Sequence, residues 1–147
     1  MLPLNQAIAT ICQSPDWDET RIVRELVARG MPRSQAEKVT ALVPLAFGRV
    51  LMKSLPIRFP SEAIVHDPQT GTNALVRLDD EPLFAEARSA AEAAYSHGVM
   101  TRDQFAAVAL RSPEVAAVNQ ALQAGARPED LECLPPELTW SSDAAQT

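Results

Sequence analysis

The amino-acid sequence predicts a mainly α-helical protein: a compact bundle of five to seven helices around a buried central helix at about residues 34–54, with a small β-hairpin at about residues 63–78. Residues 39–52 (VTALVPLAFGRVLM) form an apolar run whose only charge is Arg49. A run of this length suits a helix that is buried on nearly all sides, and it is too short to span a bilayer. Elsewhere apolar residues recur at helical spacing, except at residues 56–82, where the period becomes strand-like.

Length and composition indicate one globular domain. The 147 residues are 46% hydrophobic and 22% charged, values that are typical of a chain with a single core. We therefore predict one helical domain with a hairpin insert over residues 1–140. Residues 141–147 are small and polar without apolar periodicity, so a flexible C-terminal tail is expected there.

Two short helices are predicted before the central one. Residues 4–12 have the apolar period of a helix. The second helix is expected to begin either at Ser14, which a proline follows, or at Asp16, which has a glutamate three residues on. It should run to about Arg29 and end at Gly30, which can adopt the left-handed conformation that often closes a helix.

The central helix is expected to begin at Pro32, with Ser34 and Glu37 spaced as a capping box. Pro44 should kink or break it, because proline lacks a backbone donor and clashes with the preceding turn. Gly48 lies one turn further on and would let another helix approach closely. The positions expected to face the core are Ala36, Val39, Val43, Ala46, Phe47 and Val50.

The strand-like region predicts a β-hairpin. Residues 63–66 and 74–78 are β-prone, and the segment DPQTGTN between them is rich in turn formers. Two strands alone are marginally stable, so the hairpin should lie against helices or pair with something else. An unpaired edge would be a possible docking surface.

Helical patterns return after the hairpin. One helix is expected from Pro82 to Gly98, a second is capped by Thr101, and a third runs from Ser112 to Gly125. Prolines then limit residues 128–133 to one short turn. Three apolar residues beyond it are expected to fold back as a clasp: Leu134, Leu138 and Trp140.

The charge of the chain is unevenly distributed. Residues 1–73 carry 8 basic and 7 acidic groups, whereas residues 74–147 carry 5 and 12. An acidic half repels phosphate backbones and anionic lipids. We therefore expect a protein partner, basic in character, and neither nucleic acid nor a membrane.

Location and redox state follow from the N-terminus and the cysteines. The first residues lack a basic region followed by a long apolar stretch, so the sequence predicts a cytoplasmic location. A reducing compartment would keep Cys12 and Cys133 as thiols. Cys12 lies on the apolar stripe of the first helix and is expected to be a core thiol.

Six residues are candidates for contact with a partner. Asp79 and Asp80 directly precede Glu81 and Pro82. These three acidic residues are best explained as N-terminal caps of the helix that follows, where negative charge meets the positive end of the helix dipole. The candidate contact residues lie at the hairpin turn, before this helix and near the C-terminus: His66, Asp67, Asp79, Asp80, Glu129 and Asp130.

No motif for catalysis, metal binding or phosphate binding is recognisable. His66, His97 and two distant thiols have no spacing that would converge on a metal. A G-x-S-x-G elbow is absent, and the five glycines are too scattered for a phosphate-binding loop. We therefore expect no catalytic residue, metal site or cofactor.

The leading functional expectation is a small non-enzymatic module that binds a protein through an acidic surface or the hairpin edge. Alanine and arginine are abundant and lysine occurs only twice, a bias that suggests a bacterial, GC-rich genome. Small acidic helical domains of this kind resemble, in their general class, immunity proteins of bacterial toxin systems and secretion adaptors. The resemblance covers no sequence motif.

Two alternatives from other classes stay open. Ala94 and Gly98 have the spacing of a helix-turn-helix, and the recognition helix would begin near Thr101. That helix would carry Arg102 and Arg111 but also Asp103, within an acidic half. The other alternative is a small enzyme that uses Asp79 and Asp80 with His66 or His97.

Overall fold

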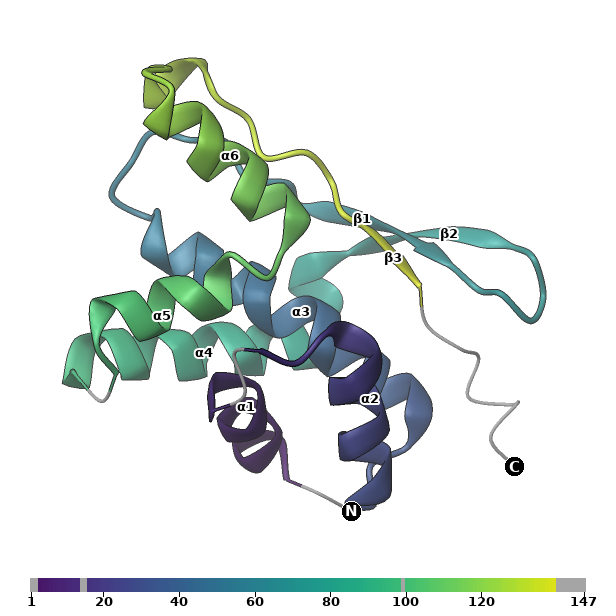
Figure 1. The fold of residues 1–147 in the computed structure, drawn as a ribbon. Coiled ribbons are helices and arrows are strands. Elements are labelled where there is room, and N and C mark those ends of the chain that lie inside the picture. Colours follow the sequence, from purple (N-terminus) through teal and green to yellow (C-terminus); the bar gives the residue numbers. More distant parts are fainter. Residues whose placement is uncertain (1–2, 14–15, 99, 140–147) are drawn as a thin grey trace.

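The computed structural model describes residues 3–13, 16–98 and 100–139 (Figure 1). They form a mainly helical fold with a small three-stranded sheet. The helices are α1 (Leu4–Gln13), α2 (Glu19–Ala28), α3 (Arg33–Leu51), α4 (Pro82–His97), α5 (Arg102–Ala109) and α6 (Pro113–Gln123). The strands are β1 (Glu62–His66), β2 (Asn73–Arg77) and β3 (Glu137–Thr139), and short 3₁₀ turns span Leu78–Asp80 (η1) and Pro128–Asp130 (η2). None of the described helices is both long and apolar enough to cross a membrane.

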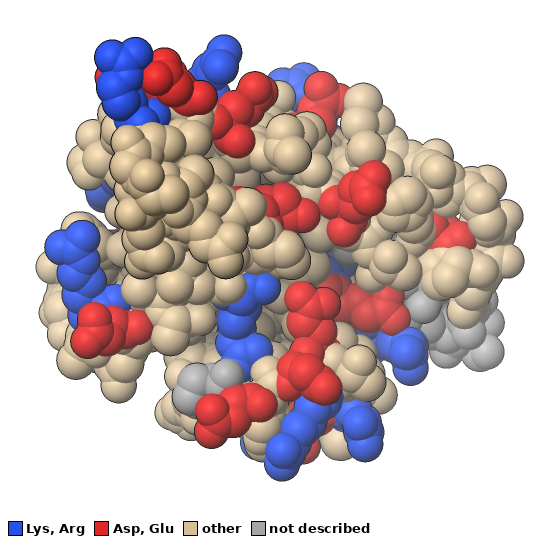
Figure 2. All heavy atoms as spheres, turned by 45° about the horizontal axis from the view of Figure 1, so that its top comes forward, with Lys and Arg blue, Asp and Glu red and all other residues tan. Residues whose placement is uncertain are grey.

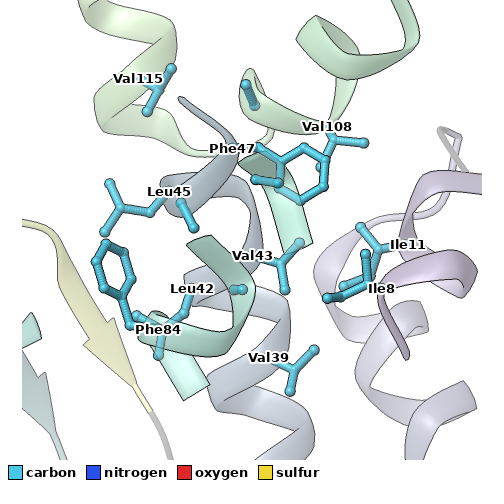
Figure 3. Packing of buried hydrophobic residues seen from close by; sticks show 14 of the residues in the cluster. Ile8, Ile11, Val39, Leu42, Val43, Leu45, Phe47, Phe84, Val108 and Val115 are labelled. Carbon is cyan, nitrogen blue, oxygen red and sulfur yellow. The ribbon is translucent and has the colours of Figure 1, made fainter. Parts of the chain in front are cut away.

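Helix α3 is the longest helix and contacts each of the other five described helices. All six positions expected to face the core are buried. The Phe47 ring stacks on Phe105 of α5 with ring centroids 4.6 Å apart. Figure 3 shows side chains from α1, α4, α5 and α6 converging on this helix.

Of the kink or break predicted at Pro44, the break is wrong, because α3 continues through Pro44 to Leu51. Proline removes one hydrogen bond from the helix, but the residues around it, from Leu42 to Gly48, are all buried. Their packing holds the segment helical. The close approach expected at Gly48 is confirmed: a Cβ added there would lie 2.5 Å from a methyl group of Val115 in α6.

Several predicted caps are confirmed and others are wrong. Thr101 and Gln104 form a capping box at α5, and Ser112 caps α6. Helix α2 is capped by Asp18, whose carboxylate accepts from the Arg21 N–H at 2.8 Å, so Asp16 is not the cap; Ser14 and Pro15 lie outside the described residues.

The capping box expected at Ser34 and Glu37 is also wrong. Pro32 is the N-cap of α3 and provides no side-chain hydrogen bond. Because the helix begins at Arg33, Ser34 lies inside the first turn with its side chain buried. The Glu37 carboxylate instead accepts from the Arg33 guanidinium at 2.9 Å.

The β-hairpin is confirmed, and a third strand joins it. Strand β2 pairs antiparallel with β1, and β3 pairs parallel with the other edge of β1, giving the order β2-β1-β3. The clasp is therefore partly a strand: Leu138 is buried in β3, whereas Leu134 is 67% exposed. Trp140 and the predicted tail at 141–147 lie outside the described residues.

The capping role predicted for the acidic residues before α4 is met only in position, by Glu81, and without a side-chain capping bond. Asp79 and Asp80 belong to the 3₁₀ turn η1, which begins at the buried Leu78. Glu81 is the N-cap of α4, yet its side chain makes no capping hydrogen bond. It lies 4.0 Å from the Lys38 ammonium group of α3 instead. Each of these three carboxylates lies within 4.0 Å of a basic side chain.

Candidate protein-binding groove

A groove of about 660 Å³ lies between α2, α3, the start of α6 and β3. Its apolar surface comes from α2, from the outer face of α3 and from β3. Its charged side chains come from α2, α3, the start of α6 and β3. The main apolar lining residues are Val23, Val27, Ala41, Pro44, Leu45, Pro113, Pro136 and Leu138, and the charged ones are Glu19, Arg24, Arg33, Glu37, Arg111, Glu114 and Glu137.

Pro44 gives the α3 wall of the groove an unusual polar group. Because proline has no N–H, the Thr40 carbonyl does not receive its usual hydrogen bond from the residue four positions on. Thr40 and Pro44 both line the groove. The Thr40 hydroxyl donates to the Ala36 carbonyl, one turn earlier in α3, at 2.8 Å. The segment of α3 that lines the groove therefore includes a carbonyl without its usual helical donor.

Arg111 joins two distant parts of the chain at one end of the groove. Its guanidinium Nη1 donates to the Trp17 carbonyl at 2.6 Å, across 94 positions of sequence. This contact fixes the segment between α5 and α6 against the segment that precedes α2. The Trp17 ring in turn packs under the Arg21 guanidinium, 4.3 Å from the ring centroid.

Two carboxylates face the same end of the groove. Partial burial raises the pKa of the Glu19 carboxyl above its ordinary value, the neighbouring Glu114 raises it further, and Arg111 lowers it. Glu114 is held by the Ser112 hydroxyl, which donates to its carboxylate at 3.2 Å. Repulsion between the two carboxylates means that a cation placed here would be favoured.

The groove as a whole is mixed in charge. Arg33 is already paired with Glu37 at 2.9 Å, which leaves Glu19, Glu114 and Glu137 opposed by Arg24 and Arg111. On the face seen in Figure 2, acidic and basic side chains interleave, with large uncharged areas between them. The groove therefore suits a ligand that has both apolar and charged side chains, with the cationic ones placed near Glu19 and Glu114.

None of the six residues predicted for partner contact lines the groove, although Pro68, next to Asp67, does; the six lie in three separate places. His66 and Asp67 are at the hairpin turn, where the His66 Nδ1 lies 2.6 Å from the Asn73 side-chain oxygen and the Asp67 carboxylate accepts from the Gln69 N–H at 2.9 Å. The turn lies at the far right of Figure 1, whereas η2, which contains Glu129 and Asp130, lies at its top.

Each acidic residue of the other two places has an arginine nearby. Asp79 lies 3.8 Å from the Arg88 guanidinium and Asp80 lies 3.9 Å from that of Arg77. In η2 a single guanidinium, that of Arg127, lies 3.5 Å from Glu129 and 3.0 Å from Asp130. The structure does not bring these residues together into one acidic surface.

The residues of the enzymatic alternative are also far apart. His97 ends α4 and Asp79 precedes its start, so the length of the helix, 16 residues or about 24 Å, separates them. His66 lies four residues along β1 from the Glu62–Arg77 pair, about 13 Å. Among the described residues, no three His, Cys, Asp or Glu side chains converge as a metal site.

The helix-turn-helix alternative has the predicted helix but few basic groups on it. Helix α5 follows the left-handed Gly98, and it buries Phe105, Val108 and Ala109 in the core. Its exposed side chains include one base, Arg102, and one acid, Asp103. No observation on these residues favours the reading of DNA bases.

The two thiols differ in burial. Cys133 is buried, and Cys12 is half-buried against the core. Burial raises the pKa of each thiol to about 11, so both are protonated and weakly nucleophilic at neutral pH.

Comparison of the chain with protein-family models, with curated proteins and with solved structures found no match.

Proposed function

We propose that this protein is a small non-enzymatic binding module that holds a basic, partly apolar segment of a protein partner in the groove between α2, α3, α6 and β3. The observation that carries the proposal is the end of the groove where Glu19 and Glu114 lie side by side, and where partial burial and the Glu114 charge both raise the pKa of the Glu19 carboxyl. A lysine or arginine of a partner would relieve this repulsion. The apolar residues beside it, such as Val23 and Leu45, would cover the aliphatic part of the partner.

The architecture supports a fixed groove. We propose that the chain is a compact bundle organised around α3, which supplies one wall of the groove and contacts the other described helices. Arg111 holds the segment before α2 against the start of α6. A wall built from helices that are tied in this way is preorganised, so little ordering energy is lost on binding.

A pair of matched variants tests the proposal. Glu19→Gln with Glu114→Gln removes the two neighbouring carboxylate charges at one end of the groove and keeps the side-chain size, whereas Glu129→Gln with Asp130→Asn removes two charges from η2. Each protein is used as bait in a cell lysate, and the captured protein is then purified and titrated. The groove variant should bind about tenfold more weakly, which corresponds to about 1.4 kcal/mol.

The test compares the affinities of the two variants for the partner and measures how each affinity changes with salt. Binding to the groove should weaken as salt is added, because exposed charges are screened. The η2 variant should bind like the wild type. Equal loss in both variants, or a partner that binds the groove variant with unchanged affinity, would show that the groove is not the docking site.

A further inference from the structure

The sheet has an open edge that the proposed function does not use. Strand β2 is the outer strand in the order β2-β1-β3, and no other described strand pairs with its far side. Four of its five residues are exposed, and Leu75 is 66% exposed. In Figure 1 the hairpin projects beyond the helices, so this edge is accessible.

The hydrogen bonds at the ends of the hairpin show which backbone groups of β2 face outward. The Asp67 N–H donates to the Thr72 carbonyl at 3.0 Å, and the Leu78 N–H donates to the Ser61 carbonyl at 2.9 Å. Bonded and non-bonded pairs alternate along an antiparallel ladder. Ala74 and Val76 therefore bond to β1.

The residues between them have the opposite orientation. Asn73, Leu75 and Arg77 direct their N–H and C=O groups away from β1 and toward solvent. The Ile64 N–H agrees with this alternation: Ile64 faces Leu75 in the register, and its N–H donates to the Pro136 carbonyl on the other side of β1 at 3.0 Å.

We propose that a second copy of this chain pairs antiparallel with β2, with the two-fold axis at Leu75. In this register Leu75 faces Leu75 of the second copy, and Asn73 faces Arg77 of the second copy. All three outward-facing residues then form bonded pairs that exchange two hydrogen bonds each. The two small sheets become one continuous sheet across the axis.

Side chains favour this register over its neighbours. Leu75 and Ile64 are directly opposite on the outer face of the sheet, so the pairing aligns Ile64, Leu75 and their copies in one apolar row across the axis. A shift that centres the axis on Arg77 would place two guanidinium groups against each other. A shift to Asn73 would place Leu75 opposite Gly71. Of these three registers, only the one centred on Leu75 joins Leu75 to another apolar residue without facing like charges.

The interface is small, so the dimer should be weak and concentration-dependent. Five-residue strands bury less than the 1,200 Å² or so that stable complexes bury. The chain also has a net charge of −6, so the copies repel each other at low salt. Self-association should therefore strengthen as salt is added, the reverse of what a basic partner in the groove should show.

Charge exchange at the axis tests the proposal with the full chain. Leu75→Lys and Leu75→Glu should each be monomeric in sedimentation velocity up to about 1 mM, because each places like charges face to face. An equimolar mixture should form a heterodimer. Leu134→Lys is the matched control, since Leu134 is 67% exposed but lies outside the sheet; it should self-associate like the wild type.

A second measurement does not depend on these variants. In the wild type, amide exchange at Asn73, Leu75 and Arg77 should slow as protein concentration rises, while exchange at Ala74 and Val76 stays slow throughout. Three results would overturn the proposal: a wild type that is monomeric at all concentrations, a mixture of Leu75→Lys and Leu75→Glu that does not associate, or a loss of self-association in Leu134→Lys equal to that in the Leu75 variants. Glu19→Gln with Glu114→Gln should leave self-association unchanged, so the two proposals fail separately.

Discussion

Replacing Gly48 by alanine tests how closely α6 approaches α3. Alanine in the middle of a helix is favoured over glycine by about 1 kcal/mol. At this position, however, the added Cβ would lie 2.5 and 2.8 Å from the two methyl groups of Val115. Both residues are buried, so relief requires the Val115 side chain, or the helix that carries it, to shift. Overpacking a core costs about 1–3 kcal/mol, and the two short contacts place this site in the upper part of that range.

We therefore expect Gly48→Ala to lower the free energy of unfolding by about 1–2 kcal/mol, the overpacking cost less the helix-propensity gain. Urea unfolding followed by circular dichroism at 222 nm measures this. Val115→Ala, which removes both methyl groups, completes a double-mutant cycle. The double variant should be at least about 1 kcal/mol more stable than the sum of the single effects predicts.

The opposite sign would refute this reasoning. If Gly48→Ala stabilises the protein by about 1 kcal/mol, helix propensity acts alone and the helices are not in contact at this point. A coupling energy within about 0.3–0.5 kcal/mol of zero would lead to the same conclusion.

Three further predictions concern the core, the thiols and a helix cap. Phe47→Ala should destabilise by about 3–5 kcal/mol in urea unfolding, because the ring is 1% exposed and stacked on Phe105; a loss below about 1 kcal/mol would contradict this. With a pKa of about 11, Cys133 is about 0.1% thiolate at pH 8, so a disulfide reagent should label it at least a hundredfold more slowly in the folded than in the unfolded protein. Because this pKa is raised on folding, the associated stability is present at neutral pH and is lost as pH rises toward 11. Thr101→Ala should lower the free energy of unfolding by about 1 kcal/mol while Thr101→Ser does not, and equal losses in both would exclude the capping box.

The helical part of the fold could be predicted where local chemistry decides it. Thr101 and Ser112 each stand alone before an apolar repeat, so their caps were predictable. At α2, Ser14, Asp16 and Asp18 are all capping residues within five positions. Capping propensity alone does not rank these three residues. The start of the helix is decided by which residues of α2 are buried.

Two errors arose because burial and long-range pairing outweigh local preference. Pro44 should disrupt a helix in isolation, yet the segment around it is buried and stays helical. Strand β3 has three residues and follows two prolines, so no local pattern indicates it. It exists because Leu138 pairs with Val65, more than seventy positions earlier in the chain.

The groove was beyond prediction from sequence for the same reason. Its walls come from five separate stretches of the chain, and the contact that closes one end joins Trp17 to Arg111 across 94 positions. The acidic bias of the C-terminal half was visible, and it includes Glu114 and Glu137. What the sequence could not show is that Glu19, from the N-terminal half, lies beside Glu114 while the acidic residues at 79–80 and 129–130 lie near arginines.

The two proposed surfaces respond to salt in opposite directions, and this follows from the charge of the chain rather than from either contact alone. At 0.01 M salt the Debye length is about 30 Å, so a second copy of net charge −6 feels most of the charge of the first. At 0.15 M it is about 8 Å, and only charges next to the β2 edge still matter. The residues that face each other there, Leu75 with its copy and Asn73 with Arg77, include no pair of like charge. Added salt therefore removes the repulsion between copies and leaves the strand pairing intact, whereas it removes part of the attraction between Glu19, Glu114 and a basic partner. A salt series on one sample, followed by mass and by partner binding, should thus show one equilibrium strengthen as the other weakens.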